Sequence, residues 1–239
     1  MILGSVFFLV AAALVPPLIL LYIIYKMDKI EREPVRLLVS LFLRGVVAMV
    51  LILILELIGD KVVSVLSWNQ MVYLFCAYFI IPGFIEEGVK YVVVLRRTWN
   101  DPNFNYTFDA VVYAVFVSLG FAAVENIMYV VTSGLSTAVV RAVFSIPGHA
   151  MFGVVMGAGL AKAKRLEVQG EIQAAEAAKN RAWLTAAILH GLYDFLLVAF
   201  GAVFYLYFIG LVIYVVRLLK KSAAEDAPIR GSSGMFYDL

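Results

Sequence analysis

The sequence predicts an all-α, polytopic membrane protein of about seven transmembrane helices with a buried polar cavity, and three observations lead to this fold class. Of the 239 residues, 64% are hydrophobic and only 15% are charged, which is more apolar surface than a soluble core can absorb. Apolar runs close to the roughly 20 residues that cross a bilayer recur along the chain. Ionisable residues nevertheless stand inside several of these runs, where such groups normally face a bundle interior or a cavity.

Seven apolar stretches are the candidate spans. They cover residues 3–25, 36–58, 71–95, 107–132, 138–161, 182–199 and 202–219. The first has no Lys or Arg ahead of it and is longer than a signal-peptide core, so we expect it to be retained and bent at Pro16 and Pro17. Only "AFGA" around Gly201 separates the last two stretches, so six spans with a bent final pair is the alternative count.

The Lys and Arg residues predict the orientation. Alternate connections on one side hold 15 of the 19, the other side holds only Lys61 and Arg141, and Arg44 and Lys90 lie inside spans. Because cytoplasmic connections carry the excess of basic residues, we expect the amino terminus outside and the carboxyl terminus in the cytoplasm of a multi-pass cell-membrane protein.

We expect a single membrane domain over residues 1–221, since no Pro/Gly/Ser-rich linker divides it. Residues 162–181 mix charges of both signs with alanines and predict a cytoplasmic surface helix or helical hairpin. The tail over 222–239 is polar and broken by Pro228 and glycines, which predicts a disordered cytoplasmic segment. The lone cysteine, Cys76, excludes an intramolecular disulfide.

Ionisable and polar residues inside the predicted spans form the candidate site. The third span, "IPGFIEEGVKYVVVL", holds Glu86, Glu87 and Lys90; later spans hold Glu125 and Asn126, then His149, then His190 with Asp194. Both histidines of the protein belong to this set. Glu86, Glu125, His149 and His190 lie about 12–22 Å below the outer surface of an apolar layer about 30 Å thick, so one central site can contain them.

Helical spacing predicts two pairs within this set. Glu86 and Lys90 are four residues apart and can form an internal salt bridge. Glu87 lies about 100° further around the helix, so we expect it to need another partner. His190 and Asp194 are also four apart, which suits a carboxylate that accepts the imidazole N–H and fixes the tautomer of the ring.

Small residues and prolines surround the same positions. Gly153 and Gly157 follow His149, and a stripe of small residues precedes Glu125, a pattern that lets membrane helices approach closely. Pro82 and Pro147 stand shortly before Glu86 and His149, where a kink frees backbone groups to line a wet cavity.

Two classes of function fit the residues themselves. Carboxylates and imidazoles around a cavity can activate water for hydrolysis, directly or through a metal, and the same groups can relay protons or hold a cation in a transporter. The zinc motif HExxH is absent, no GxSG-like serine site occurs in a span, and "YD" at Tyr193 lacks the GxGD partner of the aspartyl intramembrane proteases.

Four motifs resemble, in the same order, those of the PrsW family of intramembrane proteases, within a wider group that includes the CAAX prenyl endopeptidases. They are "EEGVKY" from Glu86, "FAAVEN" from Phe121, "PGHAMFG" from Pro147 and "HGLYD" from His190. The resemblance implies an endopeptidase that cleaves membrane-anchored proteins, typically anti-sigma factors, at site one. It implies the protein substrate and the lipid bilayer as partners and no nucleic acid, and it leaves the oligomeric state open.

The resemblance also implies roles for the site residues. Glu86 would be the general base or first ligand, with Glu87 beside it. His149 and His190 would bind a metal or stabilise the oxyanion, and Asp194 would orient His190.

Glu125 stands where the wider group has a histidine, and it would be a further ligand or an outer acceptor, while Asn126 could donate to the substrate carbonyl. Zn²⁺ is the expected metal, held by Glu86, Glu125, His149 and His190; glutamate-activated water without a metal is the alternative.

Overall fold

The computed structural model describes residues 2–229, with side chains from residue 7 onward, and this part of the chain is helical. Its elements are α1 (Ile2–Met27), α2 (Val35–Leu66), α3 (Gln70–Phe75), the π-helix η1 (Cys76–Glu86), α4 (Glu87–Thr98), α5 (Asp109–Ser133), α6 (Leu135–Val143), α7 (Ser145–Val168), α8 (Ile172–Ala199) and α9 (Gly201–Ala224). The all-α prediction is confirmed, since residues 2–229 contain no named strand, only an isolated bridge between Tyr106 and Pro228.

Seven helical stretches are long and apolar enough to cross a membrane, which confirms the seven-span prediction over the six-span alternative. Two of them are composite. The third span, Gln70–Thr98, joins α3, η1 and α4, and the fifth, Leu135–Val168, joins α6 and α7 across a break at Phe144. The break at Phe144 lies three residues before Pro147, so this proline falls in the first turn of α7, where its missing N–H costs no helical hydrogen bond.

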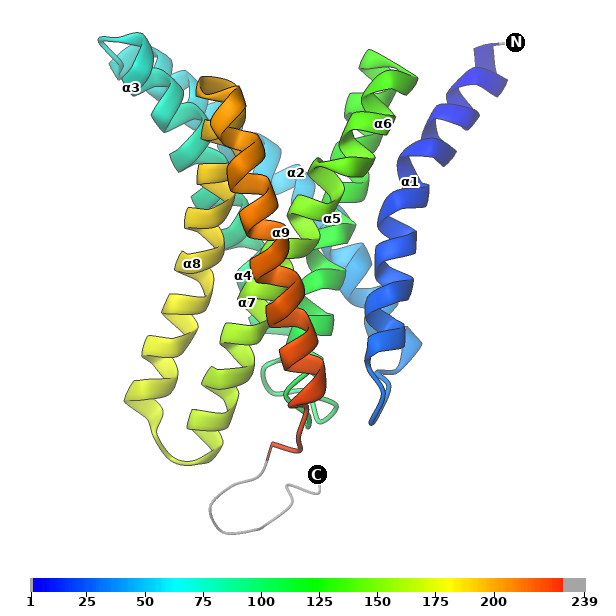
Figure 1. Ribbon diagram of the computed structural model, residues 1–239, viewed down its shortest axis with the longest axis vertical. Coiled ribbons are helices and arrows are strands. Elements are labelled where there is room, and N and C mark those ends of the chain that lie inside the picture. Colours follow the sequence, from blue (N-terminus) through cyan, green and yellow to red (C-terminus); the bar gives the residue numbers. More distant parts are fainter. Residues whose placement is uncertain (1, 230–239) are drawn as a thin grey trace.

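Helix α5 runs through the middle of the bundle, with α1, α2 and α7 packed around it (Figure 1). Its first fifteen residues are all buried, as expected for a helix that is apolar on every side. Gly157 of α7 lies directly against α5, because a Cβ at this glycine would overlap the backbone of Val111. The stripes of small residues therefore pack α5 against α7, as predicted.

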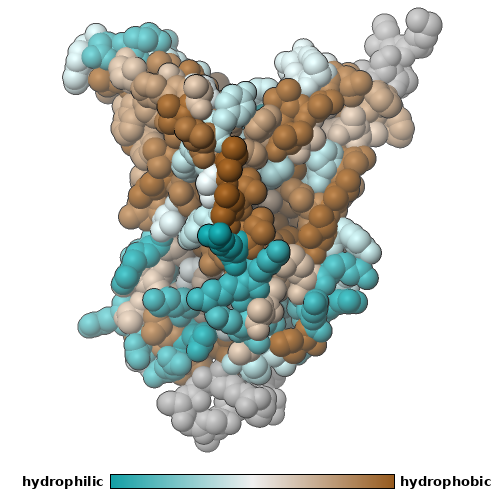
Figure 2. Space-filling view, in the orientation of Figure 1, coloured by the Kyte–Doolittle hydropathy of each residue, from teal (hydrophilic) through white to brown (hydrophobic). Residues whose placement is uncertain are grey.

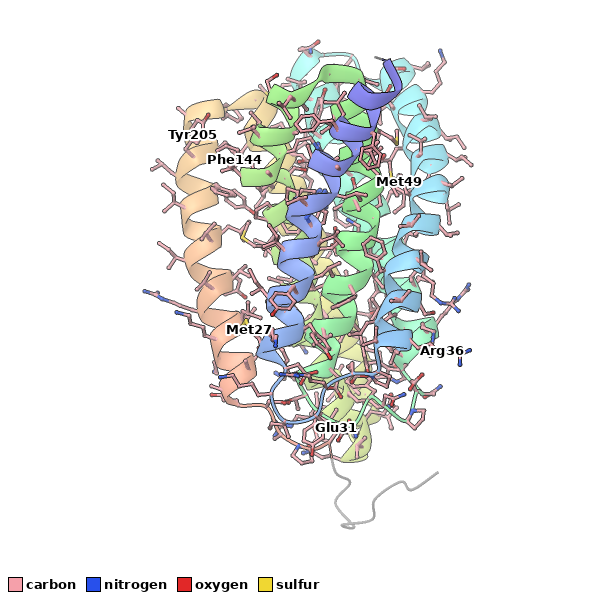
Figure 3. The ribbon with its side chains drawn as sticks, turned by 90° about the vertical axis from the view of Figure 1, so that its right-hand side faces the viewer. Met27, Glu31, Arg36, Met49, Phe144 and Tyr205 are labelled. Carbon is pink, nitrogen blue, oxygen red and sulfur yellow. The ribbon has the colours of Figure 1, made fainter. Side chains whose placement is uncertain are left out.

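The bundle has two unlike ends. At the lower end in Figure 1 the helices lie close together and carry the α1–α2 and α7–α8 connections, and at the upper end α3 and α9 diverge from α1 and α6. Hydrophilic side chains gather over the lower part, which we call the basal end (Figure 2). Figure 3 shows Met27, Glu31 and Arg36 there, whereas Phe144 and Tyr205 lie near the other end, which we call the open end.

The structure changes two of the sequence predictions, those for residues 162–181 and for the carboxyl-terminal tail. Residues 162–181 form no separate surface helix: α7 continues to Val168 and α8 begins at Ile172, so the hairpin alternative is correct. The tail is not disordered from residue 222, because α9 continues to Ala224 and Asp226 then accepts a hydrogen bond from the N–H of Phe108 at 2.9 Å. Residues 230–239 lie outside the described part of the chain.

A group of buried acids occupies the basal end. This basal cluster consists of Asp28 and Glu33 in the α1–α2 connection with Asp109 and Tyr113 at the start of α5, all of them at most 4% exposed. Asp109 accepts hydrogen bonds from the backbone N–H groups of Asn105 and Tyr106 at 3.1 and 2.7 Å. One oxygen of each of the four side chains has no hydrogen-bond partner within residues 2–229.

Burial changes the protonation of the two connection residues. Loss of water raises the pKa of Asp28 to about 6 and that of Glu33 to about 7. Tyr113 and Asp109 lower the pKa of Glu33 in part, while the negative charges of Asp226 and Glu31 add to the increase at Asp28. The basal carboxyls therefore hold protons at pH values where surface carboxyls are ionised.

Candidate active site

Four side chains from three spans converge in the interior of the bundle. Glu86 at the end of η1, Glu87 at the start of α4, His149 of α7 and His190 of α8 each place a potential ligand atom within 4.8 Å of the others, and all four are buried. Together with Lys90 we call them the central cluster. The structure therefore brings carboxylates and both histidines together, as the sequence predicted.

Lys90 lies between the carboxylates of this cluster. Its Nζ is 2.8 Å from Glu86 Oε2, 2.8 Å from Glu87 Oε1 and 3.4 Å from His149 Nδ1. The predicted Glu86–Lys90 pair is confirmed, but the expectation that Lys90 could not also serve Glu87 is wrong. A lysine side chain reaches residues three and four positions earlier on a helix, and this one is positioned between both.

Each histidine joins the cluster to a carboxylate outside it. His149 presents Nδ1 to Lys90 and Nε2 to Glu125 Oε2, the latter at 2.9 Å. His190 presents Nδ1 to Glu87 Oε1 at 3.0 Å and Nε2 to Asp194 Oδ2 at 3.4 Å. The predicted contact between His190 and Asp194 is confirmed, and Glu125 provides the same arrangement for His149.

Asn126 and Arg141 fix the surroundings of Glu125. The Arg141 guanidinium lies 2.8 Å from Glu125 Oε2, and its Nε donates to Asn126 Oδ1 at 2.9 Å. The amide nitrogen of Asn126 donates to the carbonyl of Ala13 at 2.7 Å. Asn126 is thus engaged in holding α1 against α5, which differs from the expectation that it would donate to a substrate.

The π-helix and a pair of glycines set the position of Glu86. Pro82 lies within η1 and cannot donate a backbone hydrogen bond, and π-helical turns of this kind are frequent at functional sites. A Cβ at Gly83 would lie 2.6 Å from the carbonyl oxygen of Ala187, and a Cβ at Gly191 would overlap the backbone of Phe79. The two glycines therefore let η1 and α8 approach closely, three residues from Glu86 and one from His190.

A cavity of about 510 Å³ leads to the cluster. Glu86, His149 and His190 line its inner part together with Glu125 and Asp194. Its other walls come from the diverging helices of the open end, where Figure 2 shows a notch between the two arms of the molecule. Water and an extended peptide segment can approach the carboxylates from this side.

Sequence reasoning missed two residues that line this cavity. Glu56 of α2 faces the cavity near Glu86, and Arg141 reaches it from α6. Glu56 could have been found, because it is an acidic residue inside the predicted span 36–58. Arg141 was counted among the few basic residues of the outer connections, but it lies in the last turn of α6, where its side chain lines the cavity.

The donor atoms of the central cluster suit a divalent metal. If His190 donates its Nε2 proton to Asp194, then Nδ1 and Glu87 Oε1 bring two lone pairs within 3.0 Å of each other. A proton on the ring or a cation shared by both atoms removes that repulsion. The second Glu87 oxygen, Oε2, also has no partner within the described residues. Two carboxylates and two imidazoles form an oxygen and nitrogen set of the kind that zinc accepts.

Comparison with known proteins identifies the family. A family profile described as PrsW family intramembrane metalloprotease matches residues 33–218, which include all four motifs. The chain belongs to the PrsW family.

Curated relatives of this PrsW-family chain agree. It is 32% identical to Protease PrsW of Bacillus subtilis (strain 168) over 198 residues, covering 81% of this chain and 84% of that protein. It is 34% identical to Protease PrsW of Oceanobacillus iheyensis over 194 residues, covering 81% and 85%. No solved structure matches the chain. The protein is therefore a multi-pass intramembrane protease, and these relatives give no support to the transporter alternative.

Proposed function

We propose that this protease hydrolyses a peptide bond of a membrane-anchored protein by means of water that Glu86 activates in the central cavity. One observation carries the proposal: the carboxylate and both imidazoles of the cluster line a cavity of about 510 Å³ in the interior of a seven-span bundle. The family resemblance favours anti-sigma factors as substrates and cleavage near the outer face. The opening of the cavity between the diverging helices is consistent with a substrate that arrives from the membrane.

Glu86 is the proposed general base. It lines the cavity, whereas Glu87 is fully buried behind it and is held by both Lys90 and His190. A carboxylate within reach of a bound water can take its proton as the oxygen attacks the scissile carbonyl, and can later return that proton to the leaving amine. Lys90 offsets the cost of burying the two ionised carboxylates, because it supplies the opposite charge.

His149 and His190 are proposed to bind the metal of the site, or to stabilise the negative charge that develops on the carbonyl oxygen. Asp194 and Glu125 lie against the outer nitrogens and would fix the tautomers of the two rings. Of the two roles that the family resemblance leaves open for Glu125, this position favours the outer acceptor.

Zinc fits the cluster: Glu87, His149 and His190 would hold it, which leaves one position open for water beside Glu86, the proposed base. When bound, zinc would supply Lewis-acid activation of water and of the scissile carbonyl. Glu87 thus takes the place that the sequence prediction gave to Glu125 as a ligand. Metal analysis of the purified protein tests this assignment: His149→Ala and His190→Ala should each lose bound zinc, and full cleavage by protein proven metal-free would exclude it.

The decisive experiment compares Glu86→Gln with Glu171→Gln. Both remove one carboxylate charge, but Glu171 is exposed in the connection between α7 and α8. In liposomes with a single-span test substrate, Glu86→Gln should bind the substrate and leave it uncleaved, because the amide cannot accept a proton. The Glu171→Gln variant should cleave like the original protein. Cleavage by Glu86→Gln at an undiminished rate would refute the proposed base.

The orientation is also a proposal, based on the charge distribution. Reporter fusions after Lys221 should report the cytoplasm, and fusions near Ser136 should report the outer side. The basal end would then be cytoplasmic and the open end would face outward. A cytoplasmic signal from the Ser136 fusion would reverse this assignment.

A further inference from the structure

A second, larger concavity lies on the membrane-facing side of the bundle, between α2 and the η1–α4 segment. This lateral groove has a volume of about 1100 Å³ and shares no lining residue with the central cavity. Its walls consist of Arg36, Val39, Ser40, Leu43, Arg44, Val47, Ala48, Leu51 and Leu55 of α2 with Phe84, Ile85, Gly88, Val89, Val92, Val93 and Arg96 of the facing segment. The proposed proteolytic chemistry uses none of these residues.

Regular helical spacing makes most of the groove apolar. On α2 the aliphatic residues at positions 39, 43, 47, 51 and 55 recur every four residues, and Ile85, Val89 and Val93 do the same on the opposite wall. Val39, Leu43, Val47 and Leu51 are each at least half exposed. Such a stripe on a membrane-spanning helix is suited to contact with hydrocarbon chains.

Three arginines border the basal half of this stripe. Arg36 and Arg44 are two helical turns apart on α2, with Ser40 between them, and Arg96 lies near the end of α4. Because α2 begins and α4 ends at the basal end, Arg36 and Arg96 belong to the same end of the groove. Figure 3 shows Arg36 at the lower end of α2, on the outside of the bundle.

These arginines are exposed, and none of them forms an ion pair with an acid in the described part of the chain. The single polar contact of this trio is from Arg44 Nε to Ser40 Oγ at 3.4 Å, within residues 2–229. The neighbouring Arg97 behaves differently, since it pairs with Asp101 at 2.5 Å. The groove therefore presents three positive charges and no compensating carboxylate.

Arg44 lies far enough along α2 that its charge needs a partner. It lies eight residues into α2 from Arg36, about 12 Å along the helix axis. A cation at that depth is costly unless it reaches the interface or meets an anion. Guanidinium groups match phosphate oxygens in a bidentate manner, and basic pockets between transmembrane helices recognise anionic lipid headgroups.

We propose that the lateral groove binds an anionic phospholipid of the adjacent leaflet. Its phosphodiester headgroup would lie among Arg36, Arg44 and Arg96, and its acyl chains along the aliphatic stripe toward Leu55. The excess of positive charge favours a lipid with net negative charge over a zwitterionic one. This site is independent of the proposed proteolytic mechanism.

Native mass spectrometry of the full-length protein in detergent tests the proposal, with phosphatidylglycerol and phosphatidylcholine of identical acyl chains as probes. The unmodified protein should retain phosphatidylglycerol in preference to phosphatidylcholine. Replacing arginine by glutamine at 36, 44 and 96 should weaken retention of phosphatidylglycerol about fivefold for each arginine removed, the effect of one basic residue near an anionic lipid. The single variant Arg44→Gln covers the case in which the triple variant does not fold.

The matched control is Arg217→Gln with Lys220→Gln and Lys221→Gln, three exposed basic residues near the end of α9. It removes the same charge but should leave retention unchanged. Equal retention of the two lipids, or equal loss in both triple variants, would show a diffuse charge effect and overturn the proposal. So would a lipid-free dimer, because a second copy would then occupy the groove. Binding can be measured with Glu86→Gln as background, so the result does not depend on cleavage.

Discussion

The central and basal clusters both bury carboxylates, and they meet the cost of burial in different ways. In the central cluster Lys90 lies 2.8 Å from each of two glutamates, and two imidazoles complete the set. In the basal cluster Asp28, Glu33 and Asp109 form no ion pair with any Lys, Arg or His among the described residues. There the pKa values of Asp28 and Glu33 rise instead, to about 6 and about 7.

The two clusters are suited to different roles. A carboxyl that has taken up a proton no longer needs a cation, and it also cannot act as a base. A protease that activates water needs an ionised carboxylate, and Lys90 is the group that makes this compatible with burial between the helices. The oxygens of the basal cluster share protons instead of pairing with a cation. This cluster is suited to a structural role, because it links the α1–α2 connection to α5.

The largest effect should follow from Lys90→Met. The change leaves Glu86 and Glu87 buried without their cation, and breaking a buried pair in this way costs about 3–5 kcal/mol. We expect chelator-treated protein to lose that much free energy of unfolding in detergent, and cleavage to disappear. The control, Lys29→Met, removes an exposed lysine and should change neither quantity. Unaltered stability in Lys90→Met would mean that the two clusters do not differ as described.

A smaller effect should follow from Asp194→Asn. The asparagine can no longer attract the proton on His190 Nε2, so the tautomer of the ring is fixed less firmly. Loss of such an outer partner typically lowers activity or metal affinity 10–100-fold, and we expect this decrease in kcat/KM with the melting temperature preserved. Glu125→Gln should behave similarly through His149, whereas Glu225→Gln, at an exposed site, should be neutral. A fully active Asp194→Asn would remove the outer carboxylates from the mechanism.

Local spacing explains which contacts of the site could be predicted. Glu86 with Lys90 and His190 with Asp194 are neighbours on one helix, so their separation in the sequence fixes their distance. The contact of His149 with Glu125 joins α7 to α5, and it depends on how two helices rotate about their axes, which spacing does not determine. Glu87 has a further partner in His190, as expected, but its additional contact with Lys90 was not predicted, because it depends on the side-chain conformation of Lys90, which a helical angle does not determine.

In the fold, too, features that depend on one segment could be predicted, and features that depend on packing between segments could not. Hydropathy predicts the seven spans because length and apolar content are properties of each segment alone. The π-helical form of residues 76–86 depends on packing against α2 and α8 and on the close approach at Gly83, whereas Phe144, at the break between α6 and α7, packs against Phe204 and Phe208 of α9. Pro82 and Pro147 indicate irregular backbone near both places, but they do not specify its form. Likewise, Asp226 lies in a polar tail but accepts a hydrogen bond from the N–H of Phe108, just before α5, a contact across 118 residues.

The pH dependence of stability should reveal the basal cluster. Glu33 has a pKa of about 7 in the folded protein against an ordinary value of 4.5, and Asp28 about 6 against 3.8, so the folded state binds more protons than the unfolded chain between about pH 4 and pH 7. Stability then falls as pH rises through this window, by at most about 1.4 kcal/mol per pH unit for each group, and levels off above it.

Thermal unfolding between about pH 5 and pH 8 measures this decrease. The contribution of Glu33 to this decrease is the part that disappears when Glu33 is replaced. A stability that rises steadily with pH would contradict the raised pKa values.

The smallest effect on cleavage, and the sharpest separation of the two clusters, should come from Glu33→Gln. The amide cannot ionise, and it still offers polar atoms to Asp109 and Tyr113, whose buried oxygens surround it. We expect stability near pH 5 to change little, because Glu33 is largely protonated there. Stability near pH 8 should rise by at most about 3 kcal/mol, the free energy of a pKa of about 7 against 4.5, because the variant avoids the cost of a buried charge. Cleavage should be retained, in contrast to Glu86→Gln. Glu171→Gln, at an exposed position between α7 and α8, controls for the loss of charge alone. If Glu33→Gln shows the same pH slope as the unmodified protein, Glu33 does not bind the excess protons of the folded state, and Asp28 is the next group to replace.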